Sequence, residues 1–227
     1  MRALFLEKRV TQSTKKQQAA LAATNYIRDG ITLGVGTGST VNFFIDALEG
    51  YAQHLDAIVS SSKDSTTRLE NLGIRVSELA DTGDVDLYVD GADEATKHRY
   101  LVKGGGGALT REKILAGSSR SFICIADDLK LVNVLGKFPL PIEVIPMARS
   151  YVARQLVKAG GQPTWRENFV TDNGNHILDI RSLNITNPPE LEKQLNQIPG
   201  VVTVGIFAQR PADVLLFAGD DGIRTIK

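Results

Sequence analysis

The 227-residue chain carries 26 Lys plus Arg and 26 Asp plus Glu, and 42% of its residues are hydrophobic. The balanced charge excludes the broad positive surface that nucleic-acid or anionic-membrane binding requires, and no apolar run approaches the roughly 20 residues of a membrane-spanning helix. We therefore expect neither a nucleic-acid nor a membrane partner. The lone Cys124 cannot form an internal disulfide, so we expect a cytoplasmic protein.

The first part of the chain predicts a parallel sheet. Residues 1–9 do not join the pattern that follows and are predicted to be an extension, whereas residues 12–14 have the character of a helix cap before an apolar stripe that continues to residue 27. Strands are predicted over 31–35, 57–59, 74–76, 85–89 and 122–126, and helices over 40–48, 65–72 and 109–116. This alternation predicts an α/β fold with a Rossmann-like parallel sheet flanked by helices.

The second part begins near Pro139 and Pro141, whose missing backbone donors indicate a boundary. The runs that follow predict strand 142–145, helix 149–158, a strand around 164–166, strand 176–180, helix 189–196 and strand 201–207. This β-α-β-β-α-β order is the ferredoxin-like motif, and the apolar run 214–217 can return to the first sheet. The domains predicted are a Rossmann-like catalytic domain over 10–135 plus 208–227 and a smaller α+β domain over 136–207.

A glycine- and hydroxyl-rich loop over residues 34–40, Gly-Val-Gly-Thr-Gly-Ser-Thr, follows the first predicted strand. Its glycines let a ligand approach the backbone, and the helix that begins there offers free amides and a positive dipole to an anion. The spacing departs from the dinucleotide fingerprint, and no Walker lysine follows. A tight turn is the alternative, but the density of hydroxyls favours an anion site. The serines of 60–63 repeat the theme more weakly, and a capped turn explains them equally well.

An acidic cluster follows the strand predicted over 85–89. In open α/β sheets ligands bind beyond the carboxyl ends of the strands, so Asp90 and Asp93 are expected to share a pocket. A solvated loop is the favoured interpretation for Glu94 alone. Three adjacent carboxylates near Lys103 fit a divalent cation site poorly, so no metal is expected.

The third motif combines a lysine, a glycine run and a glutamate. Lys103 precedes four consecutive glycines, 104–107. Ordering four glycines costs considerable backbone entropy, so we do not expect this run to serve only as a linker between two elements. Glu112 then falls in the first turn of the helix predicted over 109–116, where the dipole favours the ionised carboxylate, and an ionised carboxylate facing a pocket is a competent base. The alternative is a surface pair with Lys113.

The remaining chemically notable residues give no functional pattern. His54, His98 and His176 share neither a motif nor a metal-ligand spacing, so we assign them no role. The single Trp165 is interpreted as packing or surface contact in the smaller domain.

Taken together and in this order, the motifs at 34–40, 90–94 and 103–113 resemble type A ribose-5-phosphate isomerase. The resemblance extends from about residue 11 to the C-terminus and includes 136–141 and 171–175. It implies interconversion of ribose 5-phosphate and ribulose 5-phosphate in the non-oxidative pentose phosphate pathway. It further implies that no metal or organic cofactor is used and that the chain forms a homodimer.

The resemblance also implies roles for individual residues. Glu112 is similar to the base that moves a proton between C2 and C1 of the open-chain sugar through an enediolate. Asp90, Asp93 and Lys103 resemble the groups that assist ring opening, shuttle hydroxyl protons and stabilise the oxyanion. The residues that resemble the substrate-binding set of the family are Thr37, Gly38, Ser39, Thr40, Asp90, Gly91, Ala92, Asp93, Lys103, Gly104, Gly105, Gly106 and Lys130.

Two other functions are weighed against the isomerase. A sugar-phosphate-sensing regulatory domain on a related fold would use the same anion loop without turnover, and it predicts an attached DNA-binding module that this chain does not show. A coenzyme A transferase-like or nucleotide-dependent enzyme would use Glu112 as a nucleophile or residues 34–38 for a pyrophosphate. It predicts covalent acyl capture or cofactor binding.

Overall fold

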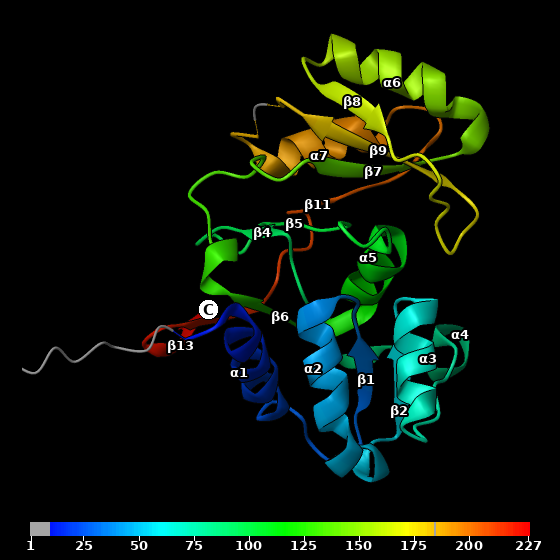
Figure 1. Cartoon of the computed structure of the whole chain (residues 1–227). Helices are drawn as coiled ribbons and strands as arrows, with labels where there is room; N and C mark the ends of the chain where they lie inside the picture. The colour runs from blue at the N-terminus through cyan, green and yellow to red at the C-terminus, as the bar shows by residue number, and fades with distance from the viewer. Residues whose placement is uncertain (1–9, 184) are drawn as a thin grey trace, which may run out of the picture.

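The computed structural model describes residues 10–183 and 185–227, so the extension predicted over 1–9 lies outside the described residues. The fold has a lower part built on a six-stranded sheet and an upper part built on a four-stranded sheet (Figure 1). A small three-stranded sheet lies between them (Figure 1). None of the helices in the described part of the chain combines the length and hydropathy of a membrane span.

The six-stranded sheet has the order β13-β12-β6-β3-β1-β2. Its strands are β1 Thr32–Val35, β2 Ala57–Ser60, β3 Val85–Asp90, β6 Ser119–Asp127, β12 Val214–Gly219 and β13 Gly222–Ile226. All neighbours pair in parallel except β12 and β13, which are antiparallel. The chain adds β2 on one side of β1 and β3 on the other, so a topological switch point lies between β1 and β3. Ligands bind at such switch points in open α/β sheets.

Helices cover both faces of this sheet. The helices are α1 Gln12–Thr24, α2 Ser39–Ala47, α3 Lys63–Asn71, α4 Leu79–Thr82 and α5 Leu109–Ser118, with 3-10 turns η1 Leu48–Gly50, η2 Ala52–His54 and η3 Asp128–Lys130. Apolar side chains of α1, α2 and α3 pack on one face in one core cluster, and those of α5 pack on the other. The sheet is therefore buried on both sides, which explains why its strands read as continuous apolar runs.

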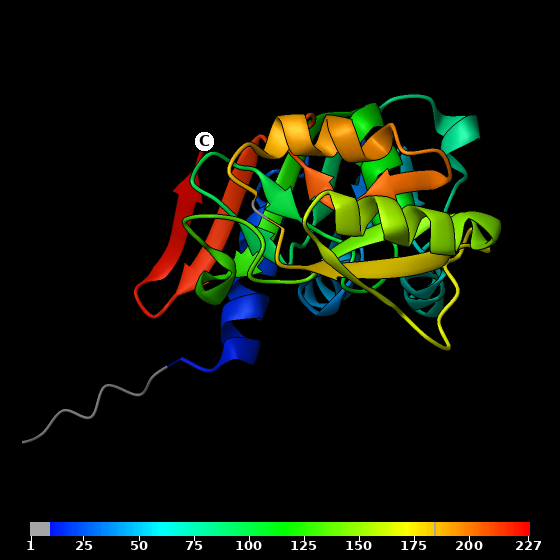
Figure 2. The same cartoon turned by 90° about the horizontal axis from the view of Figure 1, so that it is seen from above.

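The upper part, which we call the smaller unit, comprises β7 to β10 with α6 and α7 (residues 140–204). Its elements are β7 Leu140–Val144, η4 Pro146–Ala148, α6 Arg149–Lys158, β8 Gln162–Trp165, β9 His176–Arg181, α7 Pro188–Asn196 and β10 Val201–Val204. The sheet order β10-β7-β9-β8 is fully antiparallel, and both helices lie on the same side of it, as the view from above shows (Figure 2). The predicted Rossmann-like and ferredoxin-like architectures are both confirmed.

Two predicted strands are wrong in detail. Residues 74–76 form no strand, because the Ile74 amide donates to the Leu69 carbonyl (3.0 Å) and so closes the end of α3. The run 201–207 divides at Gly205 into β10 and β11 (Ile206–Phe207). β11 leaves the smaller unit and joins β5 (Leu101–Val102) and β4 (Glu94–Ala95) in the three-stranded sheet.

The first helix begins and ends earlier than predicted. Thr11 is the N-cap, since its Oγ1 accepts a hydrogen bond from the amide of Thr14 at 3.2 Å. Residues 12–14 therefore belong to the helix itself and not to its cap. The helix ends at Thr24, so Tyr26 and Ile27 lie beyond it, although both still pack against the core.

Candidate active site

The loops after β1, β3 and β5 meet the first turn of α5 around one cavity. Because Val35 at the end of β1 pairs with Val89 near the end of β3, the loops that follow these strands must lie side by side. The cavity is lined by Lys16, Thr37, Gly38, Ser39, Thr40, Gly91, Ala92, Asp93, Lys103, Gly104, Gly105, Gly106, Glu112 and Lys130. Every site residue predicted from the sequence lines this cavity except Asp90, which is fully buried.

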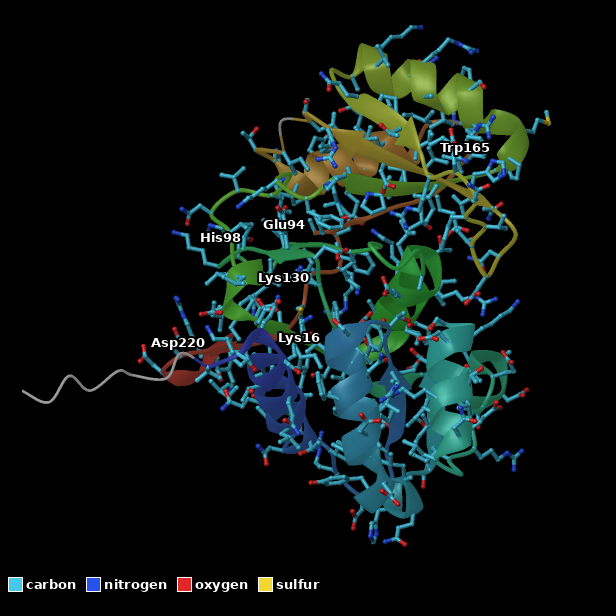
Figure 3. All side chains as sticks on the ribbon, viewed as in Figure 1. Lys16, Glu94, His98, Lys130, Trp165 and Asp220 are labelled. Atoms are coloured by element: carbon cyan, nitrogen blue, oxygen red, sulfur yellow. The ribbon has the colours of Figure 1, made fainter. Side chains whose placement is uncertain are left out.

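One end of the cavity is suited to an anion. Gly38 is the N-cap of α2 and offers no side chain, so the first amides of the helix have no partner within it. Lys16 of α1 adds a cation, and its Nζ donates to Ser39 Oγ at 2.9 Å. Figure 3 shows Lys16 and Lys130 in the region between the lower and upper parts. Sequence reasoning missed Lys16, because nothing local distinguishes it from other helical lysines.

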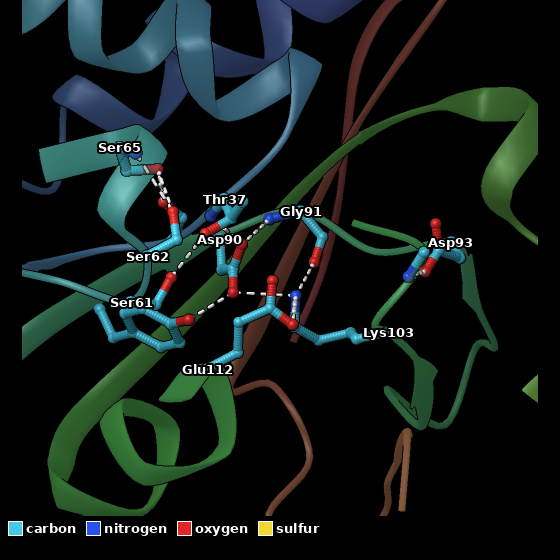
Figure 4. Close-up of polar contacts among 12 residues, drawn as sticks. Thr37, Ser61, Ser62, Ser65, Asp90, Gly91, Asp93, Lys103 and Glu112 are labelled. Carbon is cyan, nitrogen blue, oxygen red and sulfur yellow. Dashed lines mark hydrogen bonds and ion pairs between the residues drawn. The ribbon is translucent and has the colours of Figure 1, made fainter. Parts of the chain in front are cut away.

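Asp90 lies behind the cavity and is held by four donors. Its Oδ1 accepts from the amides of Thr37 (3.0 Å) and Gly91 (2.7 Å), and its Oδ2 accepts from the Tyr88 hydroxyl. The fourth donor is Lys103, whose Nζ lies 2.8 Å from Oδ2 (Figure 4). With its lone pairs satisfied in this way, Asp90 fixes the anion loop and the lysine relative to each other.

Lys103 and Glu112 form the centre of the site. The Lys103 ammonium is 3.3 Å from Glu112 Oε2 and donates to the Gly91 carbonyl at 2.6 Å (Figure 4). Both side chains are nearly inaccessible to bulk solvent, 2% and 5% exposed. Glu112 Oε2 is buried without a hydrogen-bond partner. The Glu112 carboxylate therefore lines the cavity with an oxygen that accepts no hydrogen bond and whose ion-pair partner is the Lys103 ammonium.

Burial sets the protonation of this pair. Removal from water raises the pKa of Glu112 to about 8, although Lys103 acts in the opposite direction. This corrects the expectation that the helix dipole holds Glu112 ionised. For Lys103, burial by itself lowers the pKa, but attraction to Asp90 and Glu112 outweighs it and the pKa is raised. Lys103 is consequently a fixed cation, whereas the pKa of Glu112 is about 8.

Asp93 stands apart from the Asp90, Lys103 and Glu112 group (Figure 4). Its Oδ2 accepts a hydrogen bond from the amide of Gly105 at 2.7 Å. Burial raises its pKa above the ordinary value, while the Gly105 amide and the charges of Lys103 and Lys130 lower it. Asp93 thus provides a second titratable carboxyl at the cavity wall, separate from the first.

Close backbone approach explains two of the glycines. A Cβ built on Gly36 would lie 2.0 Å from the Asp90 carboxyl, and one on Gly105 would lie 2.5 Å from Asp93 Oδ1. Neither position can hold a larger residue without moving a carboxylate of the site. The glycine content of the motifs therefore reflects the packing of Asp90 and Asp93 against the loops.

Two sequence interpretations are decided by the structure. Ser62 caps α3, with its Oγ accepting from the Ser65 amide at 3.1 Å, so the weaker serine motif is a capped turn. Glu94 is not solvated as expected. It is 3% exposed, and its carboxylate accepts from the amides of Gly136 (2.7 Å) and Phe138 (2.6 Å), because the loop after η3 folds over it.

The alternatives for the remaining residues are also resolved. Lys113 does not pair with Glu112, because it forms an ion pair with Glu192 of α7. Trp165 stacks against Arg149, whose guanidinium carbon lies 3.7 Å from the ring centroid, and it lies well above Lys16 and Lys130 in Figure 3.

Within the described residues, no group of three or more His, Cys, Asp or Glu side chains is placed to hold a metal ion.

This geometry can be compared with known proteins. The family model described as ribose 5-phosphate isomerase A (phosphoriboisomerase A) matches residues 57–222. A ribose-5-phosphate isomerase A of Francisella tularensis subsp. novicida is 57% identical over 218 residues, covering 96% of this chain and 97% of the relative. The chain belongs to the ribose 5-phosphate isomerase A family.

Solved structures agree with this membership. The ribose 5 phosphate isomerase A of Neisseria gonorrhoeae has a TM-score of 0.94 with 43% identity, over 96% of this chain and 98% of that one. A D-ribose-5-phosphate isomerase in complex with phospho-erythronic acid has a TM-score of 0.92 with 33% identity, over 96% and 100% of the two chains. As a member of the phosphoriboisomerase A family, the chain is an aldose-ketose isomerase.

Proposed function

We propose that the chain interconverts D-ribose 5-phosphate and D-ribulose 5-phosphate, a step of the non-oxidative pentose phosphate pathway, with Glu112 as the base. The observation that carries this proposal is the Glu112 carboxylate, which lines the same cavity as the Lys103 ammonium, lies 3.3 Å from it and has an oxygen that accepts no hydrogen bond. Glu112 removes the proton from C2 of the open-chain aldose and returns it to C1. The hydroxyl proton moves from O2 to O1, and no other reactant is consumed.

The phosphate group is assigned to the anion end of the cavity. The amides of Gly38, Ser39 and Thr40 at the start of α2 and the ammonium of Lys16 provide donors and positive charge. The phospho-erythronic acid bound by the related isomerase is, by its name, a phosphorylated sugar acid with both a phosphate and a carboxylate. Its carboxylate mimics the charge of an enediolate, and a ligand of this kind matches a cavity with an anion site and a cation site.

The reacting end is assigned to Lys103, the glycine loop and Asp93. Lys103 stabilises the oxyanion together with the amides of Gly104 and Gly106, since the Gly105 amide already donates to Asp93. Each well-placed donor of this kind contributes roughly 3 kcal/mol to the transition state. Asp93 is the carboxyl that assists ring opening and shuttles hydroxyl protons, with Lys130 beside it in the cavity. Asp90 acts through its contacts as a positioning residue for Lys103. Gly91 and Ala92 complete the wall.

No metal ion is needed in this mechanism, because the Lys103 ammonium already lies 2.8 Å from Asp90 and 3.3 Å from Glu112. We therefore expect ribulose 5-phosphate to form from ribose 5-phosphate at an unchanged rate after exhaustive chelation. The measurement is a direct ketose assay in metal-free buffer. A large loss that magnesium restores would instead assign Asp90 and Asp93 to a cation site, and ligand binding without turnover would support the sensor function.

The dependence of the rate on pH follows from the raised pKa of Glu112. Since the base must be ionised, we expect kcat/KM to increase as the pH rises and to level off above an apparent pKa near 8. The raised pKa of Lys103 keeps that cation charged throughout this range. The substrate phosphate titrates at about 6, so its inflection is separable. A profile that is flat from about pH 6.5 upwards would contradict the assignment of Glu112.

We further propose that residues 10–135 plus 208–227 form the catalytic domain and 136–207 the smaller one, and that the enzyme is a cytoplasmic homodimer. Pairing of β12 with β6, which brings the end of the chain back to the first sheet, supports the division. Exposed apolar side chains at the β7 and β10 side of the smaller unit, among them Ile145 and Met147, support self-association. Light scattering coupled to size exclusion tests the dimer.

A further inference from the structure

The side chains that flank Glu112 on α5 are held by the smaller unit. Arg111 donates from Nε to Asn173 Oδ1 at 2.9 Å, and its terminal nitrogen donates to the backbone carbonyl of residue 172 at 3.2 Å. On the other side of Glu112, Lys113 pairs with the buried carboxylate of Glu192. The residues on both sides of Glu112 in α5, Arg111 and Lys113, are therefore held by contacts with the smaller unit.

A third contact starts from a buried carboxylate, Glu143 of β7. Its Oε2 accepts from Thr110 Oγ1 of α5 at 2.5 Å. Its Oε1 accepts from Thr171 Oγ1 (2.9 Å), Asn173 Nδ2 (3.1 Å) and Asn175 Nδ2 (2.8 Å). Glu143 thus joins the first turn of α5 to the loop over 171–175, a motif for which the proposed catalytic steps have no use.

Sheet stability alone does not explain Glu143. Its side chain is completely buried, and within residues 10–183 and 185–227 no lysine or arginine lies within ion-pair distance of it. A buried charge without a cation is costly unless its hydrogen bonds are complete, and an apolar residue would fill a strand position in β7 at lower cost. Glu143 instead connects the first turn of α5 with the loop over 171–175, two segments that are distant in the sequence.

The start of α5 requires such an external link. Its N-cap, Ala108, provides no side-chain hydrogen bond to the first turn. The residues before it, 104–107, are four glycines, which restrict the backbone less than any other residue type. The cap therefore does not restrain the first turn through a side chain, and the glycine run itself depends on hydrogen bonds with Asp93 and Arg166 to hold its position.

We propose that Glu143 is a positioning residue for Glu112, which fixes the first turn of α5 through Thr110 and so holds the Glu112 carboxylate beside Lys103. This inference rests on the proposed function, in which Glu112 is the base. A small displacement of a catalytic group lowers the rate of the chemical step much more than substrate binding, because the reacting atoms must be aligned. Glu143 itself does not line the cavity.

The test uses two substitutions, Thr110→Val and Glu143→Gln. Thr110→Val keeps the shape of the side chain and removes the single bond to α5, leaving the other three bonds of Glu143 intact. We expect kcat to fall roughly 10- to 100-fold while KM changes by less than about twofold. Glu143→Gln keeps an acceptor oxygen and an amide that can donate to the Thr110 hydroxyl, so its loss should be smaller.

The pH profile separates positioning from a purely structural role. The titratable groups that interact electrostatically with Glu112 are Lys103, Asp90, Asp93, Tyr88 and Cys124, none of which is altered by Thr110→Val. If the first turn of α5 loosens, water reaches Glu112, and the inflection in kcat/KM moves down from about 8 toward the ordinary carboxyl range. The control is Ile180→Val, which weakens the core of the same sheet without touching α5 and should change neither kcat nor the inflection.

Each outcome decides the inference. Wild-type kcat and an unmoved inflection in Thr110→Val overturn it, and so does a matching change in Ile180→Val, because that would reflect general loosening of the sheet. If Glu143→Gln does not fold, Thr110→Val alone gives the result. The proposed function fails separately, through an active Glu112→Gln enzyme, so the two failures are distinguishable.

Discussion

Replacing Glu112 with Gln is expected to lower kcat by about 10²- to 10⁴-fold, the usual contribution of a positioned base, and to leave the fold intact. The amide occupies the volume of the carboxyl and can still present an oxygen to Lys103, but it cannot accept the C2 proton. KM should change little, because the residues proposed to bind the phosphate are unchanged. The measurement is ribulose 5-phosphate formation together with exchange of the C2 proton in deuterated water.

A matched control is available on another helix. Glu190 also lies in the first turn of its helix, α7, but it is exposed and outside the cavity. Glu190→Gln therefore removes the same charge from the first turn of a helix and should retain full turnover and exchange. Near-wild-type activity of Glu112→Gln, with exchange preserved, would remove Glu112 from the base role.

Replacing Lys103 with Met is expected to cost both activity and stability. The rate should fall by about 10²- to 10³-fold, because the oxyanion loses its main donor. The free energy of unfolding should fall by about 3–5 kcal/mol, because two carboxylates stay buried after their shared cation is removed. Lys193→Met, at an exposed position of α7, is the control and should change neither quantity.

The stability loss in Lys103→Met should depend on pH with a defined sign. Lys103 lowers the pKa of Glu112, so its removal raises that pKa further above the ordinary carboxyl value. A carboxyl whose pKa is higher in the folded than in the unfolded chain makes folding less favourable as the pH rises between the two values. The deficit in urea unfolding should therefore be larger at about pH 9 than at about pH 5. Adding Glu112→Gln to Lys103→Met should restore part of it.

An equal deficit at both pH values, with no recovery in the double variant, would contradict this explanation. It would mean that the lost ion pair between Lys103 and Glu112 does not cause the instability. The unpaired Asp90 carboxylate or the loss of packing around the lysine stem would then be the cause.

Most of the site could be predicted from local sequence. The loop at 34–40 and the acidic cluster at 90–94 each follow a strand, and parallel strands place their carboxyl ends at one edge of the sheet. The structure brings both together with Lys103 and Glu112 in one cavity. The alternation of elements predicted the two architectures for a similar reason, since the periodicity of apolar residues reflects which faces are buried.

Other features could not be predicted, because they depend on contacts between distant segments. Asp90 and Asp93 are both strand-end carboxylates in the sequence, yet only Asp93 reaches the cavity. Glu94 looks like a solvated loop residue until the segment at 136–138 donates two amides to it. Residues 74–76 do not form the predicted strand, because the Ile74 amide donates to a carbonyl at the end of α3. The apolar character of these residues does not indicate such a hydrogen bond.

By itself, the sequence determined the order and type of nearly all elements, the three motifs and nearly all of the residues that line the cavity. Only the tertiary structure decided how these residues are charged and held: the raised pKa of Glu112, Lys16 beside the anion loop, and the link from Thr110 to Glu143. The physical reason is that strand and helix formation follow from neighbouring residues. Burial, desolvation and hydrogen bonding of a side chain depend on groups that only folding brings near.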